Sequence, residues 1–157
     1  SCNRYNIGIV KEKKRITMAY VSQEKKKQLA PAIRAVLKGA GVKGTISVSH
    51  NSSLVVSLTQ GPLDLLGSAQ RHNDQVANCR GTESYQVGTY LQVNDSWCEE
   101  WARETGDERI ADFYGELIAA MKGSDWFCED DTQSDYFHRS HYIDINVGKW
   151  DKPYVLC

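Results

Sequence analysis

The chain has 157 residues, of which 41% are hydrophobic and 25% are charged, a balance typical of one globular domain. It has no apolar run near the roughly 20 residues of a membrane-spanning helix, and residues 1–20 lack the apolar stretch of a secretory signal. Its five cysteines have no paired spacing, which favours free thiols and a cytoplasmic protein over a disulfide-bonded secreted one.

The net charge of −1 conceals a strong asymmetry along the chain. Residues 1–45 contain eleven Lys or Arg and two acids, whereas residues 46–157 contain eight Lys or Arg and eighteen acids. A basic end on an acidic body is typical of a surface that faces nucleic acid. The same pattern also arises from a solvated helix face beside a disordered basic arm, so both interpretations stay open.

The first 17 residues have no sustained helical or strand period, and they carry a basic cluster at Lys11, Lys13, Lys14 and Arg15. We interpret residues 1–17 as a disordered or non-native basic arm. One hypothesis is that this arm is translated upstream sequence and that the natural protein begins at Met18. Residues 18–157 are then expected to form a single α+β domain.

A helix is the first clear element, with Ser22 as its expected N-cap. Its apolar residues repeat with helical spacing, at Leu29, Ile33, Val36, Leu37 and Ala40. Pro31 interrupts this stripe, which predicts either a helix start near Ala30 or a kink. A β-hairpin follows, with a polar turn over residues 50–53, and Gly61-Pro62 stops its second strand.

The pattern is weaker after Gly61. Residues 67–83 are polar and predict a loop or a short, weak helix, whereas the alternation over residues 85–93 predicts a third strand. A short helix holds Trp97 and Trp101, and a stronger helix follows Asp107 and ends at Gly123. Residues 141–147 and 154–156 are expected strands. The sequence therefore predicts an α+β fold, with a largely antiparallel sheet of four or five strands packed with two main helices.

Two motifs of the form His-x-Ser are candidates for catalysis: His50 with Ser52, and His138 with Ser140. They resemble the paired motifs of two-histidine phosphoesterases, in which one imidazole is the base, the other is the acid, and the hydroxyls hold the phosphate. The resemblance implies action on a nucleotide or an RNA end. The flanking apolar patterns do not place the two motifs on adjacent strands, so surface histidines are the competing interpretation.

A metal site is the second candidate, where Cys128, His138 and His141 lie near the acids of residues 129–135. However, residues three apart at a strand entry point to opposite faces, and Cys128 has no second thiol at ligand spacing. A solvated acidic loop is the alternative. The glycine-rich signatures of nucleotide binding are absent from the sequence, so we expect no cofactor.

Binding surfaces are the remaining candidates. Exposed aromatic residues beside acids favour a protein interface over a nucleic-acid surface, because acids repel phosphate. The aromatic residues beside the acids of residues 129–135 are Trp126, Phe127 and Tyr136. The candidates for nucleic-acid contact are instead the consecutive basic residues Lys25, Lys26 and Lys27.

The segment from Tyr20 to Pro62 resembles one of the large polyvalent protein-associated domains, which occur in proteins of phages and conjugative elements. The likeness rests on the opening YVSQEKKKQLAPAIRAVL, the stretch SVSHNSSLVVSL and the Gly61-Pro62 stop. The ending SDYFHRSHYIDINVGKWDKPYVL resembles small uncharacterised phage proteins of similar length. The resemblance implies a phage or mobile-element origin and an accessory role, and it supplies no catalytic residues.

The first functional hypothesis is therefore an accessory protein that binds a host protein or a nucleoprotein complex without catalysis. The alternatives are a two-histidine phosphoesterase and a nucleic-acid-binding domain that uses the basic helix. A host protein is the expected partner and nucleic acid the alternative one, and the sequence does not address the oligomeric state.

Overall fold

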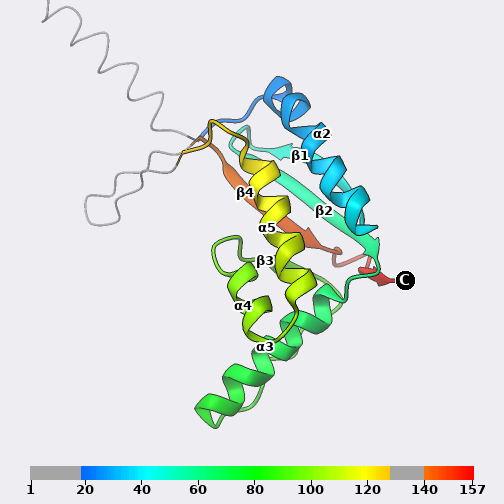
Figure 1. Cartoon of the computed structure of the whole chain (residues 1–157), viewed down its shortest axis with the longest axis vertical. Coiled ribbons are helices and arrows are strands. Elements are labelled where there is room, and N and C mark those ends of the chain that lie inside the picture. The colour runs from blue at the N-terminus through cyan, green and yellow to red at the C-terminus, as the bar shows by residue number, and fades with distance from the viewer. Residues whose placement is uncertain (1–18, 128–139) are drawn as a thin grey trace, which may run out of the picture.

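A five-stranded mixed sheet is the centre of the fold in the computed structural model, which describes residues 19–127 and 140–157 (Figure 1). The strands are β1 (Lys43–Ser49), β2 (Ser53–Gly61), β3 (Leu91–Val93), β4 (Tyr142–Val147) and β5 (Val155–Leu156). Their order in space is β1-β2-β4-β3, and β5 pairs with the end of β2. The predicted α+β class is confirmed, whereas the interpretation of residues 1–17 as an arm lies outside the described residues.

The sheet is not largely antiparallel, so that part of the prediction is wrong. β1 with β2 and β3 with β4 are antiparallel, but β2 runs parallel to both β4 and β5. Parallel neighbours need a crossover connection that returns the chain to the end at which it started. Here the segment between β2 and β4 contains helices. The alternation of apolar and polar residues predicts that a strand forms, but it does not predict the direction of the neighbouring strand.

Within residues 19–127 and 140–157, four helices rather than two main ones accompany the sheet: α2 (Gln23–Ala40), α3 (Leu65–Arg80), α4 (Cys98–Glu104) and α5 (Glu108–Lys122). Helices α2 and α5 contact each other in front of the sheet, and α4 packs against α5 (Figure 1). Helix α3 extends away from the lower end of the sheet. Among the described residues, no helix is long and apolar enough to cross a membrane.

The first predicted helix is confirmed as α2. Ser22 caps it, since its hydroxyl accepts a hydrogen bond from the Lys25 backbone N–H at 3.0 Å. Gly41 ends it in the left-handed conformation, with φ of 72°. The prediction of a start near Ala30 is wrong, because the helix continues from Gln23 through Pro31.

Helix α3 spans 16 residues where a loop or a weak helix was predicted. Only Leu65, Ser68 and Ala77 are buried along it, so the apolar stripe that signals a packed helix is missing. Its ends are capped instead, because the Asp64 carboxylate accepts from the Gly67 N–H at 3.0 Å.

The core lies between the helices and one face of the sheet. Alternate residues of β2 and β4 face it, and the register sets Val56 beside Ile145, both fully buried. Each such side chain contributes about 1.5–3 kcal/mol through burial. The other face is polar and includes Ser57 of β2 and Asp144 and Asn146 of β4. One face of this sheet therefore defines the inside of the domain.

The end of α5 is joined to the start of β4 through His141. Its ring is buried, and its Nε2 lies 2.9 Å from the Met121 carbonyl oxygen. The Trp126 indole N–H donates to the His141 carbonyl oxygen at 2.9 Å. Burial of the imidazole lowers the pKa of His141, so the ring is neutral when it meets the Met121 carbonyl.

We expect the free energy of unfolding to fall as the pH drops from about 7 to about 5. The unfolded chain has an ordinary histidine pKa and takes up a proton in this range. Folded His141 has a lower pKa and stays neutral, so protons favour the unfolded state. Urea denaturation at the two pH values measures the change.

The matched control is His50→Asn. His50 is exposed at the hairpin tip with φ of 53°, a conformation that Asn tolerates. This variant should keep the pH dependence of the wild type. His141→Gln, whose amide can still donate to Met121, should lose most of it, and an unchanged pH dependence in that variant would refute the role of His141.

Candidate functional site

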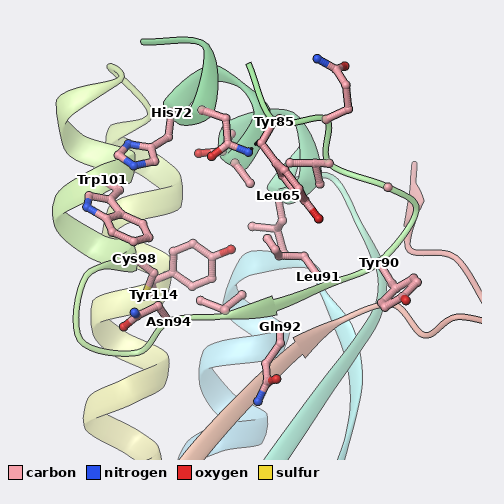
Figure 2. A pocket seen from close by; sticks show the side chains of 17 residues that line it. Leu65, His72, Tyr85, Tyr90, Leu91, Gln92, Asn94, Cys98, Trp101 and Tyr114 are labelled. Atoms are coloured by element: carbon pink, nitrogen blue, oxygen red, sulfur yellow. Dashed lines mark hydrogen bonds between the residues drawn. The ribbon is translucent and has the colours of Figure 1, made fainter. Parts of the chain in front are cut away.

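A cavity of about 590 Å³ lies where α3, α4 and β3 meet the loop of residues 84–90 (Figure 2). Its volume falls within the range of roughly 300–1,000 Å³ that small-molecule sites occupy. Leu65 of α3, Leu91 of β3 and Tyr114 of α5 are among the side chains around it. The pocket is thus built from several elements of the crossover between β2 and β4 rather than from one motif.

The lining of this pocket has no acidic side chain and no Lys or Arg, and we call it the charge-free pocket. All 17 lining residues belong to the described part of the chain, and none of them is Asp, Glu, Lys or Arg. Cys98 also stays uncharged, because burial raises the pKa of its thiol to about 12. An ionic ligand would lose its hydration here without gaining a counter-charge, so the chemistry of the walls suits an uncharged ligand.

Tyr114 supplies the buried polar group of the pocket. The residue is 4% exposed, and its ring reaches from α5 with the hydroxyl pointing toward the side of Leu65 (Figure 2). Within residues 19–127 and 140–157, this hydroxyl has no hydrogen-bond partner. Burial raises the pKa of Tyr114, so the phenol keeps its proton and acts as a donor.

Two stacked rings form one wall. His72 of α3 and Trp101 of α4 lie with their ring centroids 4.4 Å apart and an interplanar angle of 16°. Both rings line the pocket, and Figure 2 shows them side by side across from Tyr85. Stacking of this kind orients both rings, so the wall presents fixed aromatic surface to a ligand.

The opposite side is a loop that α3 holds in place through the side chain of Gln70. The Gln70 Oε1 accepts from the Val87 N–H at 2.8 Å, and the Nε2 donates to the Tyr85 carbonyl at 3.3 Å and to the Ser84 hydroxyl at 3.2 Å. Asn73 donates to the same Tyr85 carbonyl at 3.0 Å. These contacts explain why only Leu91–Val93 of the predicted strand over residues 85–93 joins the sheet.

A charged contact outside the pocket positions α3. The Arg71 guanidinium donates to both carboxylate oxygens of Asp107, from Nε at 3.0 Å and from Nη2 at 2.8 Å. Partial burial opposes ionisation of Asp107, but hydrogen bonds from Arg71, Ser68 and Thr105 outweigh it, so its pKa lies below the usual range. Because Asp107 directly precedes α5, this pair sets the distance between two pocket walls.

The structure places Ser52 and Ser140, the described serines of the two His-x-Ser motifs, at one end of the sheet. Ser52 directly precedes β2 and Ser140 lies shortly before the parallel strand β4, and the Tyr142 N–H donates to the Ser52 carbonyl at 2.8 Å. His50 is exposed, and the Ser140 hydroxyl accepts from the Phe127 N–H at 2.9 Å. His138 lies outside the described residues, so two-histidine catalysis stays a prediction.

The metal hypothesis is likewise only partly testable, since Cys128 and His138 are not among the described residues. His141 is occupied by the Met121 carbonyl. In the described ranges there is no group of three or more His, Cys, Asp or Glu able to hold a metal ion.

The predicted aromatic interface is only partly accessible. Trp126 is half-buried, packs against the core and lies beneath the Lys122 ammonium, 4.4 Å from the ring centroid. Phe127 is also half-buried, and Tyr136 lies outside the described ranges. The Trp126 ring also belongs to the joint between α5 and β4, and protein binding through these aromatic residues stays a prediction.

The three consecutive lysines do not form one surface, because successive residues of a helix point about 100° apart. Lys25 donates to Asp125 at 2.8 Å, Lys26 is half-buried, and Lys27 is exposed. Nucleic-acid binding through this helix stays a prediction that the ion pair of Lys25 weakens.

Comparison with known proteins returns no match: no family model fits the sequence, and no curated protein or solved structure is similar to it. The resemblance to a large polyvalent protein-associated domain accordingly stays a prediction.

We expect Gln70→Ala to loosen the loop of residues 84–90. The Val87 N–H loses its acceptor, and a hydrogen bond of this kind contributes about 1 kcal/mol net. Hydrogen exchange of the Val87 amide should accelerate by roughly three- to tenfold. Gln75→Ala, an exposed change on the same helix, should leave that rate unaltered; equal rates in both variants would contradict the role of Gln70.

Proposed function

We propose that this chain is a binding protein whose site is the charge-free pocket, and that its ligand is an uncharged, largely apolar small molecule. The observation that carries the proposal is the combination of an apolar, aromatic lining with one buried hydroxyl of Tyr114. Ligand sites typically combine apolar walls with a few polar groups that orient the ligand.

An accessory role in a phage or mobile element is the broader setting of this proposal. It is supported by the resemblance of residues 20–62 to a mobile-element domain. A cytoplasmic location in the host cell belongs to the same proposal. Free thiols at Cys79, Cys98 and Cys157 support it, since reduced cysteines are usual there.

We expect the protein to bind indole and to bind indole-3-carboxylate at least about tenfold less tightly. The carboxylate must give up its hydration, and no cation in the lining replaces it. Titration followed through the side-chain N–H resonance of Trp101 reports both affinities, because the ring lies in the wall.

Ala69→Trp is the blocking variant, because Ala69 is half-buried on α3 and lines the pocket. It should abolish indole binding. Ala35→Trp adds the same side chain at an exposed position of α2 and should leave binding intact. Equal affinity of indole and its carboxylate, or binding that survives Ala69→Trp, would refute the proposed site.

A second candidate function, binding of a host protein, is favoured by two exposed aromatic residues that we call the Trp150 patch: Tyr90 and Trp150. Both residues are at least 52% exposed. They lie on neighbouring segments, because the Tyr154 N–H donates to the Thr89 carbonyl at 3.2 Å. Exposed aromatic groups of this kind are typical of protein interfaces.

If a host protein docks here, Tyr90→Ser combined with Trp150→Ser should abolish its co-purification from host lysate. Loss of two aromatic anchors is expected to cost well over tenfold in affinity. Tyr20→Ser is the matched control, since Tyr20 is also exposed but lies outside the patch. A partner retained by the double variant, or lost equally in the control, would contradict docking at the Trp150 patch.

A further inference from the structure

We propose that the ligand of the charge-free pocket is an aromatic ring bearing a hydrogen-bond acceptor, and that this acceptor meets the hydroxyl of Tyr114. This inference rests on the proposed function and specifies its ligand class. It follows from three features of the pocket: an unpartnered buried donor, aromatic walls and the absence of charged side chains.

The buried donor comes first. The Tyr114 hydroxyl is held in the interior at 4% exposure of the residue, and it has no partner in the described part of the chain. Tyr154, the other buried tyrosine among the described residues, differs, because its hydroxyl donates to the Leu63 carbonyl at 2.8 Å. Buried tyrosine hydroxyls usually have a partner, so a donor that faces a cavity without one points to a group that the cavity receives.

The direction of the hydrogen bond follows from the protonation state. Burial keeps the phenol protonated, and its proton is available to an acceptor in the pocket. The neighbouring Cys98 thiol is a weak acceptor and is buried in the same wall. The complementary ligand atom is therefore a lone-pair acceptor, such as a ring nitrogen or a carbonyl oxygen.

The walls select the shape of the ligand. Trp101 and His72 present stacked planar rings on one side, and Tyr85 lies across from them (Figure 2). A flat ring fits between such surfaces with offset or edge-to-face contacts, whereas a bulky aliphatic group does not match them. Because no Asp, Glu, Lys or Arg lines the pocket, the ring itself is uncharged.

A pair of matched ligands tests the inference. Naphthalene and isoquinoline have nearly the same size and shape, but only isoquinoline has a ring nitrogen that accepts a hydrogen bond. At about pH 8 isoquinoline is uncharged, so the comparison isolates the acceptor. Quinoline, with its nitrogen at a neighbouring position, covers the second orientation of the same ring.

In the wild-type protein the better of the two nitrogen heterocycles should bind about three- to tenfold more tightly than naphthalene. In Tyr114→Phe, which removes only the hydroxyl, this preference should disappear. Trp101→Leu is the second variant: it should weaken all three ligands while keeping the preference for the heterocycle, because Tyr114 is unchanged. Affinities come from NMR titration, and the spectrum of each variant confirms that it is folded.

Each outcome decides between the proposals. If the preference for the heterocycle is the same in the wild type and in Tyr114→Phe, the role of Tyr114 is overturned. In that case, loss of naphthalene binding in Ala69→Trp still supports the proposed pocket. Failure of all these rings and of indole to bind the wild type overturns both proposals. If Trp101→Leu also loses the preference for the heterocycle over naphthalene, the Tyr114 hydroxyl is not the source of that preference.

Discussion

The parallel pairing of β2 with β4 is the constraint on which the arrangement of this protein depends. Two neighbouring strands that run in the same direction cannot be joined by a turn, so the chain must travel back along the sheet before β4 begins. It does so through α3, β3, α4 and α5, and the last of these helices packs beside α2 on the core face (Figure 1). The crossover is therefore a structural necessity, and the pocket lies within it.

Leu65, Cys98 and Tyr114 join the pocket walls to the hydrophobic core, and specific contacts outside the core position the remaining walls. The side chain of Gln70 secures the loop, Arg71 with Asp107 fixes α3 against the start of α5, and the ring of His72 meets Trp101. Polar contacts of this kind define positions by distance and angle rather than by burial alone. They leave a cavity in which the hydroxyl of Tyr114 is buried, and an unsatisfied buried hydroxyl costs about 1–3 kcal/mol. The buried Tyr114 hydroxyl therefore lowers the stability of the fold, and a ligand that accepts its hydrogen bond would recover this free energy.

The elements that were predicted correctly are those whose residues carry their own signal. Helix α2 has an N-cap at Ser22, a periodic apolar stripe and Gly41 at its end, and α5 has the same kind of stripe. The β1–β2 hairpin has alternation and a polar turn, with His50 and Asn51 at positive φ. The full length of α3 and the loop of residues 84–90 were not predicted, because they depend on contacts with Asp107, Gln70 and Asn73. These partners are distant in the sequence or leave no hydrophobic pattern. Tyr114 belongs to the apolar stripe of α5, and no local signal distinguishes its hydroxyl from that of an ordinary core tyrosine.

The sequence by itself determined the α+β class, the Ser22 cap of α2, the end of α5 at Gly123 and the first hairpin. These features depend on caps, on glycine and on the periods of 3.6 and 2 residues, which are local properties of the chain. Only the tertiary structure decided that β2 and β4 run parallel, that Ser52 and Ser140 come to the same end of the sheet, and that Tyr114 faces a cavity. The physical reason is that strand partners and cavity walls are set by contacts between residues far apart in the chain, whose pairing is chosen by the packing of the whole domain.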